Sequence, residues 1–322
     1  MVAALVILDG ASEPLRDGQP TSLERAHTPV LDALAATAFL TRLRTIPAGL
    51  PAGSETAIPV LLGWVPEAPV DRGLLEAAAR GITVPDHHHA WRIDAIAGGG
   101  GRAAPAATRR LAEEIRLVAR DHTVRLIGGH RLLVVGPPPL PVPAGDGRRI
   151  WPAGAVPPHR LDADTIVVSG AGASAGAGRL MGAGVIVPDG ATGGLDTDLD
   201  AKGACAADAI RSGARRVVVH VGAPDEAAHL LDAKAKVAVI ERIDRELIPL
   251  IVAAIGEVDG VLRICADHGC DPATGMHDAA PVPALTWTPG MARGRGRARL
   301  TERAVAGLPV TNPVWPAVAV TA

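Results

Sequence analysis

Short apolar runs that end abruptly in Gly, Asp or His constrain the fold of this chain more than any other feature. They are rich in β-branched residues and cover Ala4–Leu8, Thr165–Ser169, Gly184–Val187, Arg216–Val221 and Gly260–Ala266. Helix-like stretches separate them, at Thr28–Ala36, Asp198–Ser212 and Asp232–Glu257. Near-continuous apolar strands that alternate with helices predict an α/β fold with a mostly parallel sheet covered on both faces.

The carboxyl ends of these strands are where a functional site is expected, because ligands gather there in open parallel sheets. Asp9, Asp225 and the Asp267–His268 pair fall at or just beyond such ends.

The middle of the chain differs in composition and predicts a smaller inserted unit. Residues 68–163 contain the tract Gly98–Gly101 and the run Pro137–Pro143. Within them Arg109–Arg120 reads as an amphipathic helix and Val124–Val135 as strands. Proline-rich joins are typical of a hinge. We therefore predict a core domain of residues 1–67 and 164–322, with an inserted α/β lid domain over residues 68–163.

Composition excludes several classes of function. With 322 residues, 48% of them apolar, the chain can bury a large core, and a net charge of −2 gives no electrostatic footprint for nucleic acid. Residues 291–299 are basic but lack aromatics, which favours a solvated loop. Three cysteines form no paired framework. The apolar N-terminal run is far shorter than the ~20 residues of a membrane span. We expect a cytoplasmic protein without membrane or nucleic-acid partners.

Two pairs of residues have the composition of metal ligands. Asp225 and His229 stand four apart after a strand, and on a helix this spacing places both on one face. Asp and His together suit Mn, Zn or Co, although the spacing also arises by chance. Asp267 and His268 follow another strand, with His277 nine residues further on. An Asp-capped turn with a surface histidine is the alternative interpretation.

Two further positions carry the same ambiguity. Asp9 ends the first apolar run, where a carboxylate serves either as a metal ligand or as a helix cap. Ser54 follows Gly53 at the predicted start of a helix, where the helix dipole would stabilise an attacking oxygen and a phosphoryl group. A Gly-Ser helix start is also a common structural cap. Taken together, these positions form the mixed Asp/His set that metals need beside an activated hydroxyl.

Ten segments, which occur in order almost from end to end, carry a resemblance to a known family. They are Ile7–Gly10, Thr28–Asp32, Pro51–Ala57, Leu61–Pro66, Arg72–Ala77, Gly129–Arg131, Pro188–Gly193, Ala223–His229, Ala266–His268 and Pro281–Pro283. In these segments the chain resembles the cofactor-independent phosphoglycerate mutases of the archaeal-type branch, within the alkaline phosphatase superfamily. The resemblance implies a three-layer sandwich with an inserted lid domain, and a place in glycolysis.

The resemblance also implies roles for individual residues. One divalent metal ion would be held by Asp9, Ser54, Asp267 and His268, and a second by Asp225, His229 and His277. Manganese is expected, with zinc, cobalt or magnesium as alternatives. Ser54 would take the phosphoryl group and return it to the other hydroxyl of the retained glycerate. Arginines of the insert would grip a small phosphorylated carboxylate, since guanidinium pairs with phosphate and carboxylate in bidentate fashion. The candidates are Arg72, Arg92 and Arg131.

Three hypotheses follow, and they differ in turnover. The first is an isomerase that interconverts 2- and 3-phosphoglycerate or a close analogue. The second is a phosphohydrolase on the same core, in which water discharges the phosphoserine. The third is a metal-binding relative without turnover, which seven filled ligand positions argue against. The sequence does not predict an oligomeric state. It departs from the family at Glu55, where Asp usually follows the serine, and it is shorter than typical members.

Overall fold

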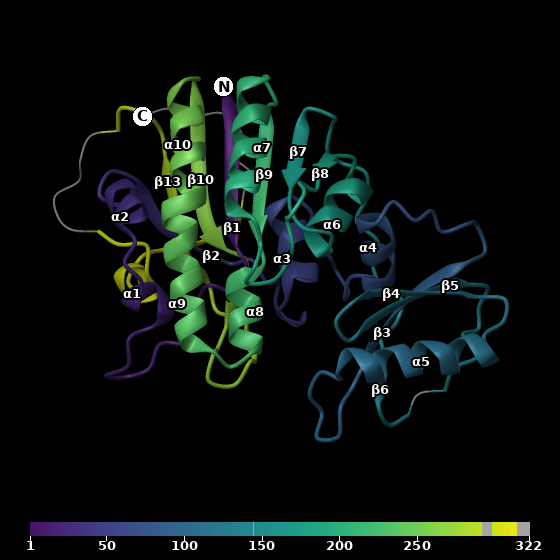
Figure 1. The fold of residues 1–322 in the computed structure, drawn as a ribbon. Coiled ribbons are helices and arrows are strands. Elements are labelled where there is room, and N and C mark those ends of the chain that lie inside the picture. Colours follow the sequence, from purple (N-terminus) through teal and green to yellow (C-terminus); the bar gives the residue numbers. More distant parts are fainter. Residues whose placement is uncertain (144, 292–297, 314–322) are drawn as a thin grey trace.

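The computed structural model describes residues 1–143, 145–291 and 298–313, and among them eight strands form the main sheet (Figure 1). In order across the sheet these strands are β14 (Val310–Thr311), β2 (Phe39–Leu43), β13 (Val282–Trp287), β10 (Gly260–Ala266), β1 (Val2–Leu8), β9 (Arg216–Val221), β7 (Thr165–Val168) and β8 (Gly184–Ile186). Of these described strands only β13 runs antiparallel to its neighbours. The predicted mixed α/β fold with a mostly parallel sheet is confirmed.

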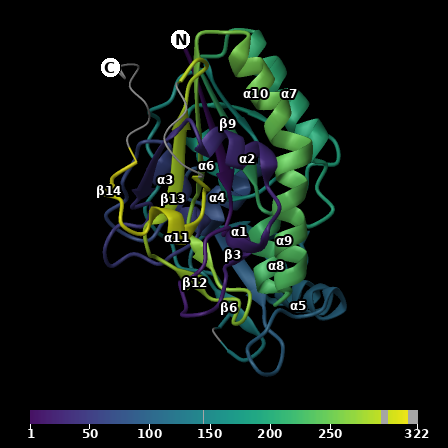
Figure 2. The same ribbon diagram turned by 90° about the vertical axis from the view of Figure 1, so that its left-hand side faces the viewer.

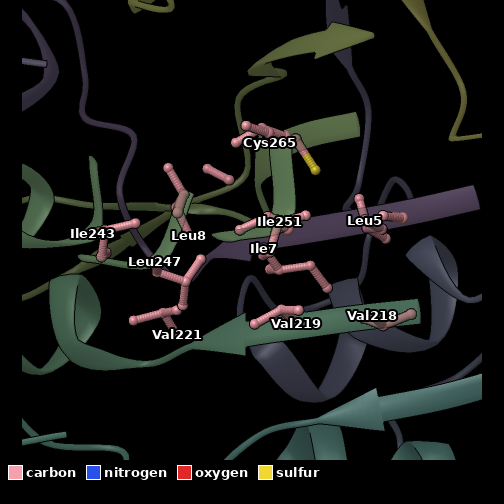
Figure 3. Close-up of a cluster of buried hydrophobic side chains, with 14 of the residues drawn as sticks. Leu5, Ile7, Leu8, Val218, Val219, Val221, Ile243, Leu247, Ile251 and Cys265 are labelled. Carbon is pink, nitrogen blue, oxygen red and sulfur yellow. The ribbon is translucent and has the colours of Figure 1, made fainter. Parts of the chain in front are cut away.

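The centre of the sheet is buried because β1 lies between β10 and β9 and is apolar on both faces. Leu5 and Ile7 of β1 lie beside Val219 of β9 in one cluster (Figure 3). Cys265 of β10 belongs to the same cluster and is fully buried. Burial on both faces explains why these strands are apolar runs and do not alternate with polar residues.

Helices cover both faces of the sheet. The helices of this core are α1 (Ser22–Arg25), α2 (Pro29–Ala35), α3 (Ser54–Leu61), α6 (Ala173–Met181), α7 (Leu199–Arg211), α8 (Ala223–His229), α9 (Ala233–Arg242), α10 (Ile248–Gly256) and α11 (Glu302–Val305). Figure 2 shows α7, α9 and α10 together on one side of the sheet. The connections β7–α6–β8 and β8–α7–β9 cross the sheet in opposite directions, so right-handed crossovers place α6 on the face opposite α7.

The helix predicted over 232–257 is one rod with a π turn, η1 (Ile243–Leu247), between α9 and α10. Pro249, which has no N–H to donate, follows soon after this turn. The turn directs the buried Asp244 carboxylate at the backbone N–H groups of Val30 (3.1 Å) and Leu31 (2.7 Å). These N–H groups begin α2, whose own N-cap residue makes no side-chain bond. A distant carboxylate therefore caps α2.

Within residues 68–163 a separate four-stranded sheet forms, in the order β4-β5-β3-β6. Its elements are β3 (His89–Ala95), β4 (Thr123–Gly128), β5 (Arg131–Gly136), β6 (Arg148–Ile150) and the covering helix α5 (Pro105–Val118). A buried cluster of its own joins this helix to the sheet, through Leu111 and Ile115 from α5 and Ile93 and Leu132 from the strands. This unit lies beside the main sheet in Figure 1. The predicted helix and strand pair are present in it, and its action as a lid stays a prediction.

Helix α4 (Arg72–Ala79) joins the two sheets. It packs against α6 so closely that a Cβ on Gly176 would lie 2.1 Å from the carbonyl oxygen of Leu75. Only glycine fits there. The residues that open the predicted insert are thus held against the core.

Two sequence features from the termini can now be placed. The basic stretch 291–299 lies largely outside the described residues, which exclude 292–297. Its last residue, Arg299, pairs with Asp32 at 3.1 Å and donates to the Ala26 carbonyl at 2.8 Å, so this arginine is structural. Among the helices of the described chain, none combines the length and the apolar character that a membrane span requires.

Candidate metal centre

All seven predicted metal ligands lie at the carboxyl edge of the main sheet. Asp9 follows β1, Asp267 and His268 follow β10, and the helix that carries Asp225 and His229 follows β9. These three strands are neighbours and parallel, so their ends meet. Ser54 and His277 approach the same edge from α3 and from the two-residue strand β12 (His277–Asp278).

The first group of ligand atoms surrounds Ser54. Its Oγ lies 3.0 Å from Asp9 Oδ1 and 3.4 Å from His268 Nε2. Asp9 Oδ1 is 3.2 Å from the same ring nitrogen. The Asp267 carboxylate completes the group, with Oδ1 accepting from the backbone N–H groups of Gly10 and His268. Ser54 is the first residue of α3, so its hydroxyl lies at the positive end of that helix.

Gly10 allows the two groups to approach each other. It has φ +59°, and a Cβ there would lie 2.7 Å from Asp225 Oδ1. A side chain at this position would therefore be strained and would collide with a predicted ligand.

The second group is built around Asp225. Its carboxylate oxygens lie 3.2 Å from His229 Nε2 and 3.3 Å from His277 Nε2. The two histidine nitrogens are 2.9 Å apart. The Cys270 sulfur belongs to the same group, in which one ligand atom from each of the four residues lies within 4.8 Å of all the others.

Hydrogen bonds to carbonyl groups fix the orientation of two of the rings. His277 Nδ1 lies 2.9 Å from the Ala52 carbonyl oxygen, and His268 Nδ1 lies 3.0 Å from that of Gly269. A carbonyl oxygen only accepts, so each Nδ1 carries the proton and each Nε2 is directed into the cluster. This is the usual arrangement of histidines that bind metals through Nε2.

The charges in this pocket are strongly coupled. Burial and repulsion by Asp9 raise the pKa of Asp267 to about 6. Burial would also raise the pKa of Asp9, but hydrogen bonds with His220 and His268 outweigh it and hold that pKa well below its usual range. Asp225 Oδ1 and Asp267 Oδ2 are buried without a hydrogen-bond donor among the described residues. Such orphaned carboxylate oxygens among inward-facing ring nitrogens fit divalent cations.

Several residues of the site were not singled out from the sequence. His220 on β9 lies 3.1 Å from Asp9 Oδ2. Lys202 is fully buried, and its Nζ donates to the carbonyls of Thr192 (3.1 Å) and His220 (3.3 Å). Burial lowers the pKa of Lys202 to about 8, against the attraction of Asp9. Lys202 stands on the otherwise apolar face of α7, and this position in the sequence could have indicated a buried functional lysine.

Two of the predicted substrate arginines lie around one indole ring. The Arg72 guanidinium carbon lies 3.6 Å from the centre of the Trp151 ring, and the same guanidinium pairs with Glu55, the neighbour of Ser54. Arg92 donates to Asp94 at 2.8 Å. Asp94 also accepts from the Trp151 indole N–H at 2.8 Å. Trp151 thus contacts Arg72 directly and holds the carboxylate that holds Arg92.

The third predicted substrate arginine, Arg131, differs from the other two in its ion pairing. Arg131 begins β5, and its guanidinium forms no ion pair with the residues that the structure describes. Burial and the nearby positive charge of Arg92 lower the pKa of Arg131. Glu76 and Asp94 attract it from further away without forming an ion pair, so this buried guanidinium is suited to bind an anionic ligand.

Fold and site together define an α/β protein with groups of candidate metal ligands at the carboxyl edge of a mostly parallel sheet. The sequence profile of the Metalloenzyme superfamily matches residues 1–308. The chain belongs to this superfamily, and divalent metal use follows from that membership and from the ligand groups.

Named relatives extend over nearly the whole chain. The 2,3-bisphosphoglycerate-independent phosphoglycerate mutase of Methanopyrus kandleri is 28% identical, over 88% of this chain and 87% of its own. A probable enzyme of the same name from Geobacter sulfurreducens is 27% identical, over 94% and 95%.

Two solved structures have a similar fold. A Pyrococcus horikoshii protein superimposes with a TM-score of 0.75 at 26% identity, over 97% of this chain and 93% of its own. The cofactor-independent phosphoglycerate mutase of Thermoplasma acidophilum has the same fold, with a TM-score of 0.58 at 20% identity, over 97% of each chain.

Proposed function

We propose that this chain is a phosphoglycerate mutase that interconverts 2- and 3-phosphoglycerate through a phosphorylated Ser54. The names of the relatives support the activity. One observation carries the serine: its hydroxyl lies at the helix N-terminus and within 3.0–3.4 Å of Asp9 and His268.

The proposed cofactors are two divalent ions, manganese first, with zinc, cobalt or magnesium as alternatives. Bound ions would polarise phosphoryl oxygens and lower the pKa of a neighbouring hydroxyl. The residues proposed to hold them are Asp9, Ser54, Asp267 and His268 in one group, and Asp225, His229 and His277 in the other.

The chemistry of the chain itself is a pair of phosphoryl transfers. In the first, a bond forms from Ser54 Oγ to phosphorus while the bond from phosphorus to a glycerate oxygen breaks. The proton that the serine gives up matches the one that the freed glycerate hydroxyl gains. The second transfer reverses these steps onto the other glycerate hydroxyl, and Ser54 is restored. The glycerate must stay bound between the two steps.

The insert of residues 68–163 is proposed to retain the glycerate. Arg72, Arg92 and Arg131 would bind its carboxylate and phosphate groups, with Arg131 the most available because it lacks an ion-pair partner among the described residues. Closure over the site would also exclude water, which otherwise discharges the phosphoserine.

The test follows purified protein with 3-phosphoglycerate and added Mn²⁺, Co²⁺, Zn²⁺ or Mg²⁺, and scores isomer exchange against free phosphate. Exchange without phosphate release supports the mutase. Phosphate without exchange selects a phosphohydrolase on the same core. Formation of neither 2-phosphoglycerate nor free phosphate would overturn the proposal.

Ser54→Ala is expected to reduce exchange by more than about a thousandfold, because it removes the atom that forms the covalent bond. The protein should remain folded, which circular dichroism and thermal unfolding check. Ser212→Ala, at the exposed end of α7, is the matched control and should keep full activity. Near wild-type exchange by Ser54→Ala would exclude the covalent route.

A further inference from the structure

A cysteine that the metal prediction did not include lies in the second ligand group. Cys270 is fully buried, and its sulfur lies within 4.8 Å of a ligand atom from each of Asp225, His229 and His277. The other two cysteines lie elsewhere. Cys265 belongs to the hydrophobic core (Figure 3), and Cys205 packs against that core from α7.

The backbone places Cys270 beside a predicted ligand by register. It belongs to β11 (Gly269–Cys270), which pairs antiparallel with β12, and its direct partner across the ribbon is His277. Side chains of directly paired residues lie on the same face of a ribbon, with Cβ atoms about 4.5–5.5 Å apart. A common ion is therefore within reach of both.

Buried polar contacts fix the backbone at this position. The Lys236 ammonium, itself fully buried, donates to the Cys270 carbonyl at 2.6 Å, and the Cys270 N–H donates to the Ser12 carbonyl at 2.9 Å. Lys236 is also 3.1 Å from the Glu13 carboxylate. These contacts to the backbone of Cys270 hold the two-residue strand β11 in place.

The spacing of the ligand atoms suits one ion. The nitrogen and oxygen atoms of Asp225, His229 and His277 are 2.9–3.3 Å apart. Ligands at about 2.0–2.1 Å from a tetrahedral Zn²⁺ lie roughly 3.3 Å from one another. Asp225 Oδ1 is buried without a hydrogen-bond donor among the described residues, and a carboxylate oxygen in that state is suited to bind a cation.

We propose that Cys270 is a fourth ligand of the ion held by Asp225, His229 and His277, and that its sulfur gives this group a preference for Zn²⁺ or Co²⁺ over Mn²⁺ or Mg²⁺. Thiolate ligands favour zinc and cobalt, whereas carboxylates and waters suit manganese and magnesium. The inference rests on the metal centre of the proposed function. It departs from the manganese proposed above at this group only, because the group around Ser54 contains no sulfur among its described ligand atoms.

The test is the near-ultraviolet absorption spectrum of the protein loaded with Co²⁺, in which a thiolate ligand produces a sulfur-to-cobalt charge-transfer band. We expect the band in the wild type and in Cys205→Ser, and its loss in Cys270→Ser. In competition titrations Cys270→Ser should weaken Zn²⁺ binding by at least about tenfold, since even outer-shell changes cost 10–100-fold. Binding of Mn²⁺ should change much less.

The wild-type spectrum decides even if the variants fail to fold. Two bound Co²⁺ ions without a charge-transfer band, or a band that survives in Cys270→Ser, would overturn the inference while leaving the mutase proposal intact. A wild-type protein that binds no Co²⁺, Zn²⁺ or Mn²⁺ at all would overturn both.

Discussion

At the scale of single residues, the site depends on side chains whose partners set their charge. His130 is an example outside the metal centre. It is 9% exposed, and its Nε2 lies 4.0 Å from Asp94. Burial lowers the pKa of His130 from 6.5 to about 4, and the charges of Arg131, Arg102 and Arg92 add to the effect against the attraction of Asp94. The ring is therefore neutral in the folded protein at neutral pH.

A dependence of stability on pH follows from this depressed pKa. Between pH 6.5 and about 4 the unfolded chain binds a proton at His130 and the folded chain does not. The contribution of neutral His130 to the stability of the folded protein is therefore complete above pH 6.5 and is lost as the pH falls toward 4. When the pH is lowered from 7.5 to 5, the unfolding free energy of the wild type should fall by about 1–2 kcal/mol more than that of His130→Gln.

Urea unfolding at the two pH values measures this difference. Other histidines titrate in both proteins and cancel when the two are compared. Parallel pH profiles for wild type and His130→Gln would contradict the prediction.

Residue by residue, the sequence indicated those site members that stand at the ends of apolar runs. Asp9, Asp225, Asp267 and His268 could be located in this way because a parallel sheet brings strand ends together. Cys270 could not, since it meets Asp225 only through the short β11–β12 ribbon. The role of Trp151 could not be predicted for a similar reason, because it depends on residues that the fold brings together from β6 and α4.

Trp151 leads to a prediction about substrate binding. Its ring lies 3.6 Å from the Arg72 guanidinium, a cation–π contact of about 1–2 kcal/mol when partly desolvated. Trp151→Ala should therefore raise KM for phosphoglycerate roughly five- to thirtyfold, with a smaller change in kcat. Trp151→Phe keeps an aromatic ring but loses the indole N–H that donates to Asp94. Its KM should lie between that of the wild type and that of Trp151→Ala.

Steady-state kinetics at saturating metal provides the measurement. An unchanged KM in Trp151→Ala would show that the proposed arginine grip does not depend on this ring. Thermal unfolding of the variant checks that a change in KM does not come from a general loss of structure.

At the scale of helices and strands, the parallel core could be predicted and the antiparallel edge could not. The runs at 4–8, 165–169, 184–187, 216–221 and 260–266 became β1, β7, β8, β9 and β10 within two residues. Burial on both faces made these strands continuous apolar runs, which are easily read. By contrast, β2 mixes exposed and buried residues, and β13 contains Pro283 and two half-buried residues at its end. Neither has a continuous apolar run.

The candidate metal centre brings together three carboxylates that repel one another. The carboxylates of Asp9, Asp225 and Asp267 come from β1, α8 and the end of β10, and Asp9 raises the pKa of Asp267. Divalent cations should offset this repulsion. We expect metal-saturated protein to be more stable than chelator-treated protein by about 2.7 kcal/mol for each ion present at a hundredfold excess over its Kd.

Thermal unfolding with and without chelator measures the gain, and Asp225→Asn should remove the part that belongs to one group. Identical melting curves in the presence and absence of metal would contradict the assignment of these carboxylates.

At the scale of the whole molecule, the arrangement of the two sheets bears on how water is kept out of the site. Proline-rich joins predict a division near residues 68 and 163, which stays a prediction, and they give no sign that α4 packs against α6. An ion pair connects the insert to α8, the helix that carries two of the predicted ligands: Arg102 Nη1 lies 2.7 Å from Glu226 Oε1. Glu226 directly follows the predicted ligand Asp225, so this pair connects the insert to the site.

We expect this ion pair to favour the closed arrangement, and its loss to let water reach the phosphoserine. A partly exposed pair contributes about 0.5–1 kcal/mol, so the ratio of phosphate release to isomer exchange should rise about two- to fivefold. Glu226→Gln and Arg102→Gln should do so equally, and the double variant no more than either, because one contact is removed in each case. Arg211→Gln breaks a solvent-exposed ion pair to Glu257 on the surface of the core domain, and is the matched control that should leave the ratio unchanged. A rise in Arg102→Gln alone would instead make this arginine a substrate contact, and no rise in either variant would show that the pair does not hold the insert closed.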